Sequence, residues 1–142
     1  MANEFEVRIT RNDLPKKKRE LPGEMKKRMD ALAEEGTNIA KVSMQQSPAS
    51  GRSYMRGKKM HTASSPGNPP RPDSGRLVNS MRWDRMGTNG QTQQRRIIAA
   101  TEYAFYEEFG TTKMEARPFM GPMAQQLRGL VKGHFDGILE ED

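Results

Sequence analysis

The stretch that decides the fold is YAFYEEFGTTKMEARPFMGP, from Tyr103 to Pro122. Four of the chain's eight Phe and Tyr residues fall within its first seven positions. Aromatic side chains bury more area than other types, so we expect the core to form here, with Phe109 and Phe119 buried against the last helix. The four clustered residues are Tyr103, Phe105, Tyr106 and Phe109.

The sequence after this stretch predicts a helix. Apolar residues recur every three or four positions from Phe119 to Leu139, which is the helical period, and Pro122 falls in a first turn that tolerates it. His134 lies on the apolar face of this helix. A lone histidine there is more often a satisfied core residue than a metal ligand.

The sequence before it predicts a small antiparallel sheet. Residues 92–104 and the segment from Trp83 to Met86 flank Gly87-Thr88-Asn89-Gly90, and Asn-Gly favours the tight turn of a hairpin. Residues 75–83 mix helical and strand periods, so a helical turn and a strand both remain open there. Residues 4–10 alternate polar and apolar, as a half-buried strand does.

Residues 21–44 predict a long amphipathic helix. Met25, Met29, Leu32 and Ile39 share one face of it. Gly36 weakens the helix by about 1 kcal/mol relative to alanine, which allows a bend or break there.

Residues 45–75 form the longest stretch without periodicity. The stretch is rich in Ser, Gly and Pro, and Asp73 is its single acid. Two interpretations remain open: a floppy surface loop, or an arm that reaches a neighbouring subunit or a phosphate backbone. For the second, the candidate residues at the subunit interface or facing DNA are Arg52, Tyr54, Met55, Arg56, Lys58, Lys59 and Met60.

Composition narrows the class of protein. The 142 residues fit one domain, in which residues 1–20 form the N-terminal strand and a basic linker and residues 45–75 an extended basic loop. The net charge of +6 fits a nucleic-acid partner and an ordinary soluble surface about equally. Cysteine is absent, which removes disulfides and thiolate chemistry, and no apolar run approaches the roughly 20 residues of a membrane span.

No motif indicates catalysis. The only histidines are His61 and His134, and Glu107 and Glu108 are adjacent, so they point to different sides of a helix or strand. Salt bridges from Glu102, Glu107 and Glu108 to Arg95 and Arg96 are the ordinary interpretation of these charges. We therefore expect no enzyme, no catalytic or metal-binding residues and no cofactor.

Two ordered groups of residues resemble the neck proteins of long-tailed bacteriophages, a putative tail-component family of tail-completion or head–tail joining proteins. The upstream group is a Pro-rich segment followed by Ser74-Gly75-Arg76-Leu77 and Ser80. Together the groups span about residues 66–139. The main group comprises Tyr103-Ala104, Tyr106, Glu108-Phe109-Gly110-Thr111, Lys113-Met114 and Arg117-Pro118-Phe119.

The resemblance implies an α+β fold with a long N-terminal helix, a small antiparallel β-sheet, a C-terminal helix packed on the sheet and, in this chain, a long basic loop. It also implies a structural virion protein, assembled in the host cytoplasm as a homo-oligomeric ring, commonly a hexamer. Such a ring would join the tail to the head connector, contact neighbouring neck and tail proteins, and surround the passing DNA. Non-specific contact with packaged DNA is a weaker expectation.

A second hypothesis is a sequence-independent nucleic-acid-binding protein that acts through its basic loop. Such a protein gathers basic residues beside exposed aromatics. Here the aromatic cluster lies far along the chain from the basic loop, which favours the ring protein.

Overall fold

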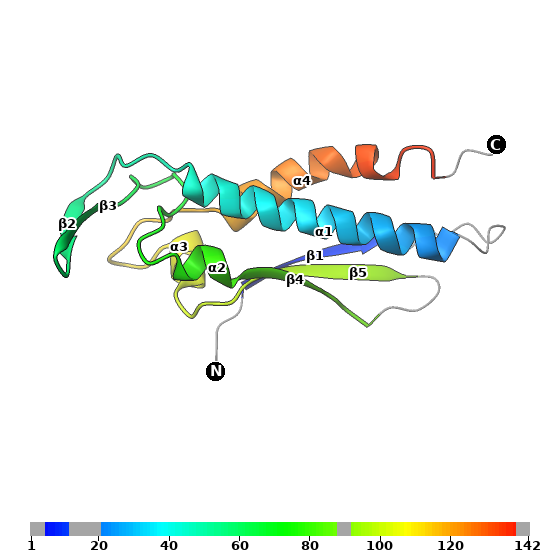
Figure 1. Cartoon of the computed structure of the whole chain (residues 1–142), viewed down its shortest axis with the longest axis horizontal. Helices are drawn as coiled ribbons and strands as arrows, with labels where there is room; N and C mark the ends of the chain where they lie inside the picture. Colours follow the sequence, from blue (N-terminus) through cyan, green and yellow to red (C-terminus); the bar gives the residue numbers. More distant parts are fainter. Residues whose placement is uncertain (1–4, 12–20, 88–91, 139–142) are drawn as a thin grey trace.

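The computed structural model describes residues 5–11, 21–87 and 92–138, and it has the mixed helix-and-sheet composition expected of an α+β protein. Figure 1 shows two long helices running side by side above a small sheet, with a separate hairpin at one end. The elements are β1 (Phe5–Arg11), α1 (Leu21–Gln45), β2 (Ser53–Arg56), β3 (Lys59–Thr62), α2 (Arg76–Ser80), β4 (Met81–Arg85), β5 (Gln93–Ala99), α3 (Ala104–Phe109) and α4 (Met120–Phe135).

The main sheet has three antiparallel strands in the order β1-β5-β4. The predicted hairpin is β4–β5, in which Trp83 pairs with Ile97, while Val7 of β1 pairs with Ile97 from the other side. Most of its predicted turn, residues 88–90, lies outside the described part of the chain. Residues 75–83 contain both a helical turn and a strand, the two structures that the sequence left open. Helix α2 ends at Ser80, and strand β4 begins at Met81.

Helix α1 covers the sheet and runs through Gly36 without interruption. A Cβ added to Gly36 would lie 2.6 Å from Ile97 Cδ1 on β5 and 2.7 Å from Leu127 Cδ2 on α4. The helix is therefore not broken at Gly36, and the glycine instead lets α1 approach both neighbours closely.

Helix α4 packs mainly on α1 and contacts the sheet at β1. The helix that covers the β4–β5 hairpin is thus α1, and the expected packing of the C-terminal helix on the sheet is limited to contacts with β1. The predicted helix also ends earlier, at Phe135, and Ile138 is buried just beyond it. His134 pairs with the carboxylate of Glu35 on α1, and Arg28 donates to its backbone carbonyl at 3.0 Å.

A fully buried arginine lies between α1 and the sheet. Arg95 of β5 has no exposed surface, and its Nε donates to Asp30 Oδ1 at 2.6 Å. The same carboxylate accepts from Arg85 Nη2 at 2.6 Å. Hydrogen bonding with Arg85 is the largest cause of the lowered pKa of Asp30. Burial of the carboxylate acts in the opposite direction, and Arg95 lowers the pKa further.

The salt bridges expected from Glu102, Glu107 and Glu108 to Arg95 and Arg96 are wrong. Arg96 pairs with Asp84 and Glu6 across the strands, which raises its pKa. Glu102 pairs with Arg76, at 3.0 Å. The reason is topological: the strand turns away at Thr101, and the three glutamates leave the sheet with the following helix.

Candidate assembly surfaces

The residues of the main resemblance form the junction between α3 and α4. Glu108 is 94% buried, and its carboxylate accepts hydrogen bonds from the backbone amides of Phe119, Met120 and Gly121 at 2.7, 2.9 and 2.8 Å. The first amides of a helix have no intrahelical acceptor and carry partial positive charge. Glu108 therefore caps α4 from the preceding helix.

The chain turns back at Gly110, where φ is +75°. A Cβ there would lie 2.8 Å from the carbonyl oxygen of Met114 and 2.9 Å from the amide of Ala116. Only glycine accommodates both that conformation and that proximity. Gly110 therefore makes a tight turn directly after Phe109.

Arg117 and Phe119 fix the far side of this turn. The amide of Arg117 donates to the carbonyl of Glu107 at 2.6 Å, and its Nε donates to the carbonyl of Ser64 at 3.1 Å. Phe119 follows Pro118 and is 1% exposed within the core. The prediction that Phe119 is buried is confirmed.

The prediction that Phe109 is buried is wrong, because 57% of it is exposed. Helix α3 has only six residues, and its buried positions are Ala104 and Glu108, four apart on one face. Phe105 and Phe109, also four apart, therefore share the outer face. The buried carboxylate takes the inward position, and the aromatics remain outside.

These exposed rings form a cluster that we call the aromatic patch. The rings of Phe105 and Phe109 lie 4.8 Å apart, and Phe5 of β1 meets Phe109 edge-on at 5.3 Å. Tyr106 meets Phe105 edge-on at 6.2 Å and is 45% exposed. The patch thus joins α3 to an edge strand of the main sheet; it comprises Phe5, Phe105, Tyr106 and Phe109.

The basic loop contains a hairpin, β2–β3, so the expectation of a segment without secondary structure is wrong for residues 53–62. Met55 pairs with Met60 and Tyr54 with His61. Because side chains alternate along a strand, the Met pair and the Tyr–His pair lie on opposite faces. Ser53 Oγ and Thr62 Oγ1 lie 2.7 Å apart on the Met face, in accord with this alternation.

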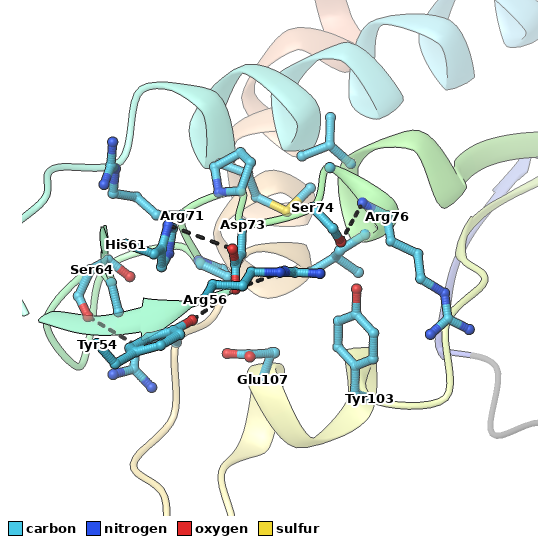
Figure 2. Close-up of a pocket in the computed structure, with 18 of the residues that line it drawn as sticks. Tyr54, Arg56, His61, Ser64, Arg71, Asp73, Ser74, Arg76, Tyr103 and Glu107 are labelled. Atoms are coloured by element: carbon cyan, nitrogen blue, oxygen red, sulfur yellow. Dashed lines mark hydrogen bonds and ion pairs between the residues drawn. The ribbon is translucent and has the colours of Figure 1, made fainter. Parts of the chain in front are cut away.

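Side chains on the inner face of the hairpin contact the carboxylate of Asp73, as Figure 2 shows. The hydroxyl of Tyr54 donates to Asp73 Oδ2 at 2.9 Å, Arg56 lies 2.8 Å from the same oxygen, and His61 Nδ1 lies 3.8 Å from Oδ1. Partial burial acts to raise the pKa of Asp73, but these partners outweigh it and hold the pKa below its ordinary value. Burial and Asp73 together raise the pKa of Tyr54.

The outer face presents the Met pair to solvent. Met55 is 59% and Met60 is 64% exposed, although both are large apolar side chains. Three basic residues of the hairpin region are also exposed: Arg52 just before β2, Lys58 in the turn and Lys59 at the start of β3. Of the candidate loop residues, the structure therefore turns Tyr54 and Arg56 inward and leaves the Met pair outward.

A pocket of about 690 Å³ separates the hairpin from α3 (Figure 2). Glu107 of α3 and Tyr103, which directly precedes α3, line one side of it. Arg71, whose Nη1 donates to the carbonyl of Thr62 at 2.5 Å, lines another. Glu107 Oε2 is buried without a hydrogen-bond partner. Burial raises the pKa of Glu107, and the nearby Arg117 offsets part of that rise.

These surfaces include Asp73, Phe5 and Glu107, which the sequence did not indicate as site residues. Asp73 was the single acid of a basic segment, and that isolation is a usable signal for an internal ion pair. Phe5 and Glu107 gave no local signal, since their roles depend on where α3 lies against β1 and the hairpin.

Among residues 5–11, 21–87 and 92–138, no group of three or more His, Asp or Glu side chains is placed to hold a metal ion. No helix within these ranges is long and apolar enough to cross a membrane. Comparison of the chain with family models, with curated proteins and with solved structures found no match.

Proposed function

We propose that this chain is a structural subunit of the neck of a long-tailed bacteriophage. In this proposal copies of the chain assemble in the host cytoplasm as a homo-oligomeric ring, commonly six-fold, that completes the tail and joins it to the head connector. DNA passes through the ring, and the protein has no catalytic role. Neighbouring neck and tail proteins are its other partners.

The observation that carries the proposal is that two separate surfaces of one chain expose large apolar side chains. The Met pair lies on the hairpin at one end of the molecule, and the aromatic patch lies on α3 and β1. Soluble monomers rarely leave such clusters uncovered, and clusters of this kind mark interaction sites. A subunit that contacts copies on two sides needs two such surfaces.

The resemblance to neck proteins adds support, because its residues act together. Three of these residues form the connection between α3 and α4. Glu108 caps α4, Gly110 adopts the positive φ of the turn, and Phe119 is buried in the core. These are architectural roles, and they fit a structural protein better than an enzyme.

Electron microscopy of the purified protein, alone and with isolated tails, tests the proposal. We expect closed rings in solution and the same density at the head-proximal end of the tail. A protein that stays monomeric both alone and with tails would contradict it. A catalytic role would be indicated by metal-dependent cleavage of DNA by the pure protein that is lost in His61→Ala.

The second candidate is a nucleic-acid-binding protein acting through the hairpin, favoured by the exposed Arg52, Lys58 and Lys59. Arg56 is neutralised by Asp73, and the Tyr54 hydroxyl is bonded to the same carboxylate, which limits its freedom to stack on a base. Three phosphate contacts predict a log–log salt slope of about −2.7 on duplex DNA, at roughly 0.9 per contact. A slope near zero would exclude this mode of binding.

A further inference from the structure

We propose that the Met pair of the hairpin in one copy docks on the aromatic patch of the next copy. This inference names the partner surface within the ring and rests on the proposed function. It specifies a head-to-tail contact, in which two different surfaces meet, rather than a contact between identical surfaces.

The first argument is that the described part of the chain does not cover the Met pair. The inner face of the hairpin is held to Asp73 by Tyr54, Arg56 and His61, and the Met pair lies on the opposite face. Met55 and Met60 consequently stay 59% and 64% exposed. The hairpin thus has an apolar face that residues 5–11, 21–87 and 92–138 leave largely exposed.

The second argument is chemical complementarity. Thioether sulfur makes favourable contacts with aromatic rings, and unbranched methionine adapts to an irregular surface. The aromatic patch offers the neighbouring Phe105 and Phe109 rings and Tyr106 beside them, each more than 40% exposed. Met side chains against aromatic rings form a better-matched contact than either surface makes with water.

The third argument is charge. The hairpin exposes Arg52, Lys58 and Lys59, and residues 51–62 contain no acid. Two hairpins in contact would therefore bring like charges together, which disfavours hairpin against hairpin. Residues 101–109, which contain α3, carry no Lys or Arg, so a contact of the hairpin with α3 avoids this repulsion.

The chain contains no cysteine, so single cysteines report this contact directly. We expect a mixture of Met55→Cys and Phe109→Cys proteins to form a disulfide-linked dimer on oxidation with diamide, while neither variant alone does so. The matched control is a mixture of Val42→Cys and Phe109→Cys, because Val42 is an exposed apolar residue on α1. That mixture is expected to give no dimer.

A second measurement tests the energetics. Met55→Ser/Met60→Ser is expected to raise the dissociation constant for self-association at least about tenfold, measured by sedimentation velocity, because a few residues at the centre of an interface carry most of its binding energy. Val42→Ser is expected to leave it unchanged. Unchanged circular dichroism of the double variant separates this effect from misfolding.

Three results would overturn the inference: Phe109→Cys alone forming the dimer, Met55→Cys alone forming it, or no dimer in their mixture while microscopy shows the variants as rings. The last result leaves the proposed function standing, because rings then form through other surfaces. Absence of any assembly by the wild-type protein removes the proposed function and this inference together.

Discussion

The carboxylate of Glu108 accepts a hydrogen bond from the backbone amide of Phe119 at 2.7 Å. No side chain next to α4 in sequence caps its first turn, so this long-range contact takes the place of a local cap. The same contact seats the Phe119 ring, which is 1% exposed, in the core. One acidic residue thus links α3 to the first turn of α4.

Replacing Glu108 tests this role. Glu108→Ala is expected to lower the free energy of unfolding by about 1.5–3 kcal/mol, the range for hydrogen bonds to a charged group. Glu108→Gln keeps one acceptor oxygen and should lose less. Urea denaturation measures both, and an unchanged midpoint for the alanine variant would contradict the capping role.

Phe119 and Phe109 differ in burial, and their alanine variants should differ accordingly. Phe119→Ala is expected to cost about 3–5 kcal/mol, as a buried phenylalanine does. Phe109→Ala should cost much less in the monomer and act instead on self-association, because 57% of its surface is exposed. Thermal unfolding at low protein concentration distinguishes them; equal losses would refute the assignment.

The buried Arg95 depends on Asp30 for charge compensation. Asp30→Ala is expected to cost about 3–5 kcal/mol, because it leaves a guanidinium buried without its counter-ion. The control is Glu102→Ala, which breaks the exposed pair with Arg76 and should cost at most about 1 kcal/mol. Chemical denaturation at pH 7 compares the free energy of unfolding of the two variants. A similar small loss in both would show that Arg95 can stay buried without a counter-ion.

Asp73 is expected to control the order of the hairpin. Its pKa is lowered, so its contribution is present above its unfolded value of 3.8 and is lost as the pH falls through the lower folded pKa. Asp73→Asn should speed amide exchange in residues 53–62 at neutral pH and leave α1 unchanged. Equally slow exchange in both proteins would mean that other contacts hold the hairpin.

Glu107 predicts the opposite dependence on pH. The pKa of the Glu107 carboxyl is raised above its ordinary value of 4.5, so the folded protein binds the carboxyl proton more tightly than the unfolded chain does. The free energy of unfolding therefore falls as the pH rises from 4.5 through the raised pKa. Glu107→Gln removes the charge and should unfold at a higher temperature than wild type at pH 7. The difference should vanish below pH 4.5; a gain that persists there would have another cause.

The aromatic stretch shows where sequence reasoning succeeded and where it stopped. A turn at Gly110 and an anchor at Phe119 could be read from residue type, since each is set by local conformation or by helical period. The exposure of Phe105 and Phe109 could not. These two rings are exposed because α3 turns Ala104 and Glu108 toward the core. That orientation depends on the hydrogen bonds between Glu108 and the first turn of α4, which is distant in the sequence.

The hairpin of residues 53–62 was missed for a related reason. Its strands are four residues each and its composition resembles a loop, so no period marks it. Its inner face is defined by Asp73, eleven or more residues away. Only the folded chain brings that carboxylate to Tyr54, Arg56 and His61.

The sequence by itself determined the α+β class, the two long helices and the strands of the main sheet. These features follow from the spacing of apolar residues within one segment, which can be seen in the sequence. Tertiary structure decided which helix covers the sheet, which charges pair, and which apolar side chains stay outside. Those outcomes depend on contacts between segments far apart in the chain. The Met pair and the aromatic patch, on which the proposed assembly rests, are of this second kind.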